Sequence, residues 1–383
     1  MPVALKDIID TAGVRTTAAS ALFKDRVPEQ DAEVVRRLTA AGAVLLGKLN
    51  LHEFAYGGTS ITSHFGAVHN PWKPDHITGG SSGGSGAAVA AGLCLGALGT
   101  DTGGSIRLPA AHCGIVGLKA TYGRVSTRGV LPLSWSLDHV GPMTRTVADA
   151  AAMLQAIAGY DAQEPTSVDR AVPDYSAAFG RKASALRLGV PREYFDALHP
   201  EVESAVSAAL ATLRRLTAGV QDVPFSVKSD DRTAIRAAEA YAYHAASVAK
   251  TPGLYQPEVL ARIRVGADVS AVAYIEAKRR MEQARRTADA VFKTVDLLVM
   301  PTVAMPPTPI ADTPADDVPR IRNVAPFNFH GYPALSLPCG FTKNGLPIGL
   351  QIVAAPWSEE SLLLVANAYE KATDWHTRRP SLA

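Results

Sequence analysis

Two hydrophobic patterns alternate along the chain. Short apolar runs typical of buried strands occupy residues 43–46, 186–191, 296–302 and 347–354. Apolar positions at three- to four-residue spacing predict a helix that opens at residues 27–31 and helices over residues 146–158, 200–216 and 359–372. Strands that alternate with helices over the whole length predict an α/β fold, and no clear domain boundary interrupts it.

Residues 228–295 are almost wholly helical in pattern, so we interpret them as a helical insert in a single domain spanning residues 1–383. The insert contains a charged run, residues 276–286, with positive charges on several helix faces. This run has two interpretations: a solvated helix face, or a helix that docks a partner.

Composition narrows the class of protein. Of 383 residues, 47% are hydrophobic and 19% charged, which is typical of a globular chain with a large core. The net charge of +2 gives no indication of a nucleic-acid partner. The N-terminus lacks the pattern of a signal peptide, and the uncharged stretch 76–100 is better explained by a core helix and a strand than by a membrane span. We therefore expect a cytoplasmic protein without membrane contact.

The three cysteines, Cys94, Cys113 and Cys339, form no CxxC pair. Neither a zinc site nor a disulfide framework is indicated, and we expect reduced thiols and no bound metal.

The segment GGSSGGSG, residues 79–86, contains only glycine and serine. It leads directly into an apolar run, so it is not typical of a flexible linker. It lacks the GxGxxG and GxxxxGK[ST] patterns of phosphate-binding loops. It matches GxSxG twice, centred on Ser81 and on Ser82, but a nucleophile elbow also needs acid and histidine partners that this motif does not identify.

A second serine motif, GTDTGGSIR, occupies residues 99–107 and places Ser105 behind two glycines. Glycines beside a serine allow a substrate carbonyl to approach the backbone, whose amides can stabilise an oxyanion. The serine hydroxyl still needs a base. Lys6 lies among apolar residues, whose burial would lower its pKa from about 10.4, although a lysine near a terminus is more often a surface residue.

Together these segments resemble the amidase signature family, and the resemblance covers essentially the whole chain. The segments that carry it are LKDIIDTAGVRTT, GKLNLHEFAYG, GGSSGGSGAAVAAG, GTDTGGSIRLPAAHCGIVGLKATYGRVS, SLDHVGPMTRTVADAA, NVAPFNFHGYPALSLPCGF and GLPIGLQIVA. The resemblance implies one large domain with a central, mixed, twisted sheet flanked by helices. It also implies a helical segment before the lysine motif, and only five residues precede Lys6 here. We interpret the chain as N-terminally shortened, which raises the question of whether Lys6 keeps its cover.

The resemblance implies a Ser-cisSer-Lys triad. Carried over, Ser105 is the nucleophile, Ser81 is the bridging serine after a cis peptide bond, and Lys6 is the base. Backbone amides of Thr102, Gly103, Gly104 and Ser105 would form the oxyanion hole. The other nearby lysine, Lys48, is given no catalytic role. No metal or organic cofactor is implied.

Three functions follow from the resemblance. The first is hydrolysis of a small carboxylic amide to an acid and ammonia or an amine, through an acyl-enzyme on Ser105. The second is the glutaminase-type A subunit of a glutamyl-tRNA(Gln) amidotransferase, although residues 250–300 do not resemble its characteristic segment. The third is a truncated family member without catalysis. For partners, we expect a small amide, at most a second copy of the chain, and no direct contact with nucleic acid.

Overall fold

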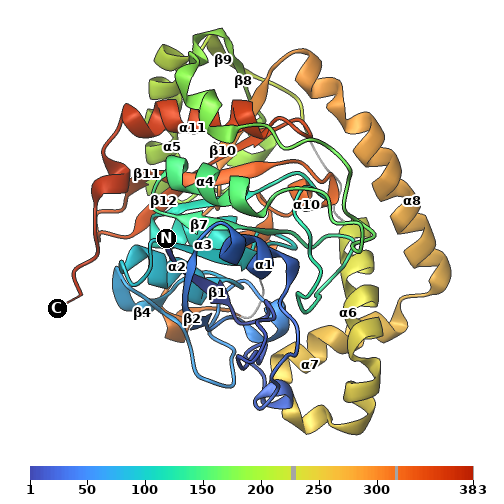
Figure 1. The fold of residues 1–383 in the computed structure, drawn as a ribbon. Helices are drawn as coiled ribbons and strands as arrows, with labels where there is room; N and C mark the ends of the chain where they lie inside the picture. Colours follow the sequence, from blue (N-terminus) through green and yellow to red (C-terminus); the bar gives the residue numbers. More distant parts are fainter. Residues whose placement is uncertain (226–229, 315–317, 383) are drawn as a thin grey trace.

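A ten-stranded mixed sheet runs through the centre of the computed structural model, which describes residues 1–225, 230–314 and 318–382 (Figure 1). In spatial order its strands are β2 (Val44–Leu49), β1 (Pro2–Lys6), β5 (Gly96–Thr100), β7 (Val140–Thr144), β6 (Val116–Lys119), β11 (Ala334–Phe341), β12 (Pro347–Ala354), β10 (Leu297–Pro301), β8 (Arg187–Val190) and β9 (Gly219–Asp222). The strands at both ends pair in parallel and the central ones antiparallel. The expected single domain around a mixed sheet is confirmed.

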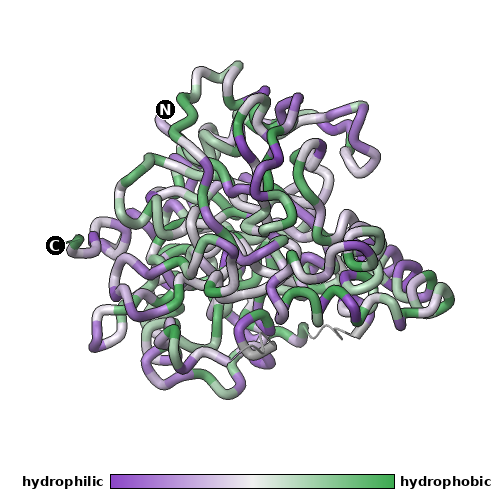
Figure 2. Tube along the Cα trace, turned by 90° about the horizontal axis from the view of Figure 1, so that it is seen from below, coloured by the Kyte–Doolittle hydropathy of each residue, from purple (hydrophilic) through white to green (hydrophobic). Residues whose placement is uncertain are grey.

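Helices pack on the two faces of this sheet. One group consists of α2 (Gly83–Ala90) and α3 (Arg107–Cys113), and the other of α1 (Glu33–Ala40), α4 (Val147–Ile157), α5 (Pro200–Leu216) and α11 (Glu359–Lys371). Side chains alternate between faces along a strand. On β5, accordingly, Ala97 packs with α2 and α3, whereas Leu98 belongs to the larger core with α4, α5 and α11. In Figure 2 hydrophobic stretches run through the middle of the molecule, and hydrophilic ones are more frequent in outer loops.

The helix α5 shows why the sequence patterns translate into these elements. Pro200 occupies the first turn, where its missing N–H is not needed. Residues Val202, Val206 and Leu210 follow at four-residue spacing, and all three are buried against the sheet. The helix covers Pro200–Leu216, as the pattern predicts.

A helical arm lies along one side of the molecule (Figure 1). It consists of α6 (Asp230–Lys250), α7 (Pro257–Arg264) and α8 (Ala271–Thr287), with α6 packed against both of the others. This arm corresponds to the predicted helical insert, of which residues 228 and 229 lie outside the described residues. The remaining elements are β3 (His69–Asn70), β4 (Lys73–Ile77), α9 (Val318–Ile321) and α10 (Pro326–Phe329), with short 3-10 helices in the connections.

Two local predictions were wrong. The apolar run at residues 43–46 forms β2, but β2 is an edge strand on which Val44 and Leu46 are 59% and 54% exposed. The first helix, α1, begins at Glu33 rather than at residues 27–31. In both cases a short local pattern predicts that the element exists. It does not predict the contacts with the rest of the fold, which decide whether a strand is buried and where a helix begins.

The stretch 76–100 forms a buried helix, α2, followed by the strand β5, as predicted. Across residues 1–225, 230–314 and 318–382, none of the helices combines the length and the hydropathy needed to cross a membrane. The three cysteines are buried and not joined by a disulfide.

Candidate active site

Lys6 lies where two parallel strands end side by side. It is the last residue of β1, and Thr100 is the last residue of the neighbouring β5. The Lys6 Nζ donates hydrogen bonds to Thr100 Oγ1 at 2.7 Å and to Ser81 Oγ at 2.7 Å. Ser81 precedes α2 and follows a cis peptide bond from Gly80. The sheet therefore brings together the lysine and the first serine that the sequence indicates, 75 residues apart.

Burial of the Lys6 side chain favours its neutral form. Its side chain is 0% exposed, so Lys6 is covered even though only five residues precede it. This burial lowers the pKa of Lys6 to about 7, against the opposing negative charges of Asp138 and Asp101. Asp138 is itself buried, and its pKa is raised to about 6 for that reason. A lysine with a pKa near 7 can accept a proton at neutral pH.

Ser105 lies in the turn between β5 and α3, beside the first serine motif. Its backbone carbonyl accepts a hydrogen bond from Ser82 N at 3.2 Å, which joins the two motifs. Ser105 is half-buried, and among the described residues its hydroxyl has no hydrogen-bond partner. It lines a pocket. The pocket lining includes Tyr56, Thr102, Gly103, Leu133, Arg236, Arg262 and Ile321.

The turn before Ser105 is held by a buried ion pair. Asp101 and Arg107 are both 0% exposed, and Arg107 Nη2 lies 3.0 Å from Asp101 Oδ1. Burial alone would raise the pKa of Asp101, but the charge and hydrogen bonds of Arg107 outweigh it and hold that pKa well below its usual range. The carboxylate therefore stays charged and also accepts hydrogen bonds from the backbone of the turn.

The same pair is anchored to the C-terminal part of the chain. Arg107 donates to Gln351 Oε1 and to Asn328 Oδ1, both at 2.7 Å, and to the Val324 carbonyl at 2.8 Å. Asn328 in turn donates to Asp101 Oδ1 at 2.8 Å. Asn328 lies on α10 and Gln351 on β12, so residues more than 200 positions apart fix the position of the turn.

One expected amide donor is already in use. Gly104 N donates to Asp101 Oδ1 at 2.7 Å, which corrects the expectation that all four amides are available for an oxyanion. Within the described part of the chain, the N–H groups of Thr102, Gly103 and Ser105 have no such partner. Gly104 instead shapes the turn: its φ is +119°, and a Cβ there would lie 2.2 Å from Val324 Cγ2.

Two other lysines are kept away from the serines. Lys48 Nζ donates to Thr16 Oγ1 at 2.7 Å and pairs with Asp7 at 3.5 Å. Lys119 is fully buried and donates to the carbonyl of Tyr332. Both lysines therefore have partners of their own away from Ser81 and Ser105, which agrees with giving Lys48 no catalytic role.

Several residues at the site were not found from the sequence. They are Thr100, Asp101, Arg107, Asp138 and Asn328. Asp101 and Arg107 lie inside the GTDTGGSIR motif, and charged residues within a block of small, apolar residues are the signal that could have indicated a buried pair.

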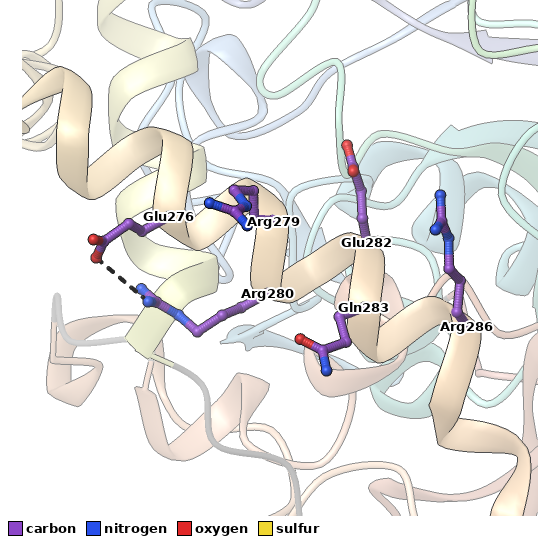
Figure 3. A pocket seen from close by; sticks show the side chains of 6 residues that line it. All are labelled: Glu276, Arg279, Arg280, Glu282, Gln283 and Arg286. Carbon is purple, nitrogen blue, oxygen red and sulfur yellow. Dashed lines mark ion pairs between the residues drawn. The ribbon is translucent and has the colours of Figure 1, made fainter.

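The charged run 276–286 on α8 has two sides. Figure 3 shows the outer side, a hollow lined by Glu276, Arg279, Arg280, Glu282, Gln283 and Arg286, with an ion pair of 3.5 Å between Glu276 and Arg280. On the inner side, Lys278 Nζ donates to Ser136 Oγ at 2.6 Å and Arg285 to the Phe329 carbonyl at 2.9 Å. The run is therefore not only a solvated face, because part of it holds the loop around Ser136.

No group of three or more His, Cys, Asp or Glu that could bind a metal occurs within residues 1–225, 230–314 and 318–382.

Removing Arg107 is expected to destabilise the fold. Arg107→Met leaves Asp101 as an unpaired buried charge, which should lower the free energy of unfolding by about 3–5 kcal/mol. Urea unfolding measures this change. As a matched control, Arg187→Met removes the arginine of an exposed pair, Arg187–Asp296, and should change stability by less than about 1 kcal/mol. Similar losses of unfolding free energy in both variants would show that the buried pair stabilises the fold no more than the exposed pair does.

Comparisons with known proteins identify the relatives of this chain. A family model described as Amidase matches residues 1–363. The A subunit of the glutamyl-tRNA(Gln) amidotransferase of Geotalea daltonii is 42% identical over 414 residues, covering 100% of this chain and 85% of the relative. The crystal structure of the same subunit from Thermotoga maritima has a TM-score of 0.89 at 35% identity, covering 100% of this chain and 86% of that one. A 6-aminohexanoate cyclic dimer hydrolase has a TM-score of 0.92 at 31% identity, with the same coverage.

The family model and the structural neighbours place this fold among amide-hydrolysing enzymes. The chain belongs to the amidase signature family. The resemblance of its motifs to that family is thereby confirmed, and the protein is an amidase.

The expectation about partners was wrong. We expected a small amide and no direct contact with nucleic acid, but relatives that match the whole chain are named as a subunit of an amidotransferase of glutamyl-tRNA(Gln). The expectation rested on the net charge of +2, and net charge is informative only about direct electrostatic binding of this chain to nucleic acid. It carries no information on an assembly in which another subunit provides that contact.

Proposed function

We propose that this amidase cleaves a carboxylic amide through an acyl-enzyme on Ser105, with Ser81 and Lys6 as its proton relay. The observation that carries the proposal is the 2.7 Å hydrogen bond from Lys6 Nζ to Ser81 Oγ in a fully buried setting, in a motif whose next residue, Ser82, is hydrogen-bonded to the Ser105 backbone at the pocket. A lysine whose pKa is lowered to about 7 supports the same assignment.

In the first half of the reaction, neutral Lys6 accepts the proton of Ser81, and Ser81 accepts the proton of Ser105. The Ser105 Oγ forms a bond to the amide carbon, whose oxygen becomes an oxyanion. When the carbon–nitrogen bond breaks, the relay returns a proton to the leaving nitrogen. Ammonia or an amine departs, and an ester on Ser105 remains.

In the second half, water gives its proton to the same relay and attacks the ester carbon. Collapse of this intermediate breaks the bond to Ser105 Oγ, which regains a proton, and the carboxylic acid leaves. The N–H groups of Thr102, Gly103 and Ser105 are the proposed oxyanion donors in both halves. Loss of such a donor typically lowers the rate about 100- to 1,000-fold.

A second candidate is the glutaminase half of a tRNA-dependent amidotransferase, because the relatives above carry that name. In this case Ser105 would release ammonia from glutamine, and a partner subunit would receive it. Glutaminase activity that rises when tRNA and the partner protein are added would support this candidate. Equal rates with and without them would favour the stand-alone amidase.

A fluorophosphonate probe tests the shared chemistry without a choice of substrate. We expect mass spectrometry to find the label on Ser105, to find none in Ser105→Ala, and to find slower labelling in Lys6→Ala. Absence of label in folded wild-type protein would overturn the proposal and leave a family member without catalysis. Circular dichroism of each variant controls for folding.

A further inference from the structure

The pocket at Ser105 is lined by arginines from the helical arm. Arg232 and Arg236 lie one turn apart on α6, and Arg262 lies on α7. Arg236 and Arg262 line the pocket directly. Nη1 of Arg232 would lie 3.5 Å from a Cβ at Gly103, so this guanidinium reaches the turn that carries Ser105.

Two of these arginines have donors without acceptors among the described residues. Arg232 is only 7% exposed, yet its Nε and Nη1 have no hydrogen-bond partner within residues 1–225, 230–314 and 318–382, and the same holds for Nε of Arg236. Burial, together with the nearby charge of Arg236, lowers the pKa of Arg232 to about 9. Arg262, in contrast, is paired with Glu258 at 2.7 Å.

Buried guanidinium donors without partners are unfavourable unless a ligand satisfies them. The pocket has no acidic residue among its described lining to do so. Asp138, a buried carboxylate behind Thr102, already accepts from Thr102 Oγ1 at 2.5 Å and from two backbone amides. The pocket is therefore positive at the place where the acyl part of a substrate must lie.

We infer that the substrate is an amide whose acyl chain carries a carboxylate, which Arg232 and Arg236 bind, and which carries no ammonium group. This inference rests on the proposed function and names its substrate class. A carboxylate matches the planar fork of a guanidinium and would supply the missing acceptors. An ammonium group, as in glutamine, would meet arginines and, within the described lining, no acid.

Three amides of one chain length separate the possibilities. Glutaramate carries the carboxylate alone, pentanamide carries neither charged group, and glutamine carries both the carboxylate and an ammonium. We expect kcat/KM for glutaramate to exceed that for pentanamide and that for glutamine by about tenfold or more, as one charge-assisted hydrogen bond provides.

The variant Arg232→Gln should remove most of the preference for glutaramate over pentanamide, mainly through a higher KM for glutaramate. Arg232→Lys keeps a positive charge and should therefore keep part of the preference for glutaramate. Arg264→Gln, which removes an exposed arginine of α7 outside the pocket, is the matched control and should keep the full preference.

Labelling of Ser105 by the fluorophosphonate probe is measured in parallel. Absence of label in the wild-type protein would overturn the proposed function itself. Normal labelling combined with equal rates for glutaramate and pentanamide, or with glutamine as the best of the three, would overturn only the inference about the carboxylate. The comparison in wild-type protein decides the matter even if an Arg232 variant fails to fold.

Discussion

Ser105→Ala is expected to abolish amide hydrolysis, with a loss in kcat of about 10³-fold or more, as for other enzymes that lose their nucleophile. Ser81 cannot replace it, because its side chain is 0% exposed and its hydroxyl is held by Lys6. Ser105, by contrast, faces the pocket. Substrate binding should survive, since the oxyanion amides and the arginines of the pocket are unchanged.

The measurement is ammonia release under saturating substrate, with intact-protein mass spectrometry to detect the acyl-enzyme. Ser85→Ala provides a matched control, because Ser85 is another buried serine of the first motif that donates to the Leu98 carbonyl at 3.1 Å, away from Lys6. Its kcat should stay within a few-fold of the wild-type value. If Ser105→Ala kept a tenth or more of the activity, another group would have to be the nucleophile.

The second large effect concerns pH. A lysine base acts only when neutral, so kcat/KM should fall as pH drops below about 7, the pKa of Lys6, by close to tenfold for each further pH unit. Above that pH the rate should level off. Lys6→Met should lose about 100-fold or more and lose this acidic limb, since general-base catalysis typically contributes about 10² to 10⁴.

Asp138→Asn sharpens this test. The negative charge of Asp138 raises the pKa of Lys6, so its removal should lower that pKa and shift the acidic limb to lower pH. Asparagine keeps one acceptor oxygen, which can serve Thr102 or the two backbone amides but not both, so circular dichroism of this variant accompanies the pH profile. A limb that does not move in Asp138→Asn, or a rate independent of pH between about 5 and 9 in the wild type, would argue against Lys6 as the base.

Much of the fold could be predicted from periodicity. The helices α4, α5 and α11 and the strands β10 and β12 lie where the pattern places them, because each has a long or strongly apolar signal. The strand β2 was expected to be buried because a short apolar run looks the same in the middle of a sheet and at its edge. Only the strand order, which depends on contacts distant in sequence, decides between these positions.

The site was predicted in part. Ser81, Ser105 and Lys6 came from the family resemblance, since their spacing alone does not show that they meet. The residues that hold them, Asn328 and Gln351, were missed because their role depends on tertiary contacts with the turn at Ser105. The arginines of the arm belong to a helical pattern that carries no information about which side chains turn inward.

The anchoring of the Ser105 turn also constrains when activity can arise during synthesis. Arg107 reaches its acceptor on Gln351 across 244 positions of sequence. At about 5–20 residues per second, a ribosome needs roughly 12–50 s to travel that far, and throughout this time Asp101 and Arg107 lack their final partners. A growing polypeptide therefore carries both serines and the lysine long before the residues that anchor the Ser105 turn have been made.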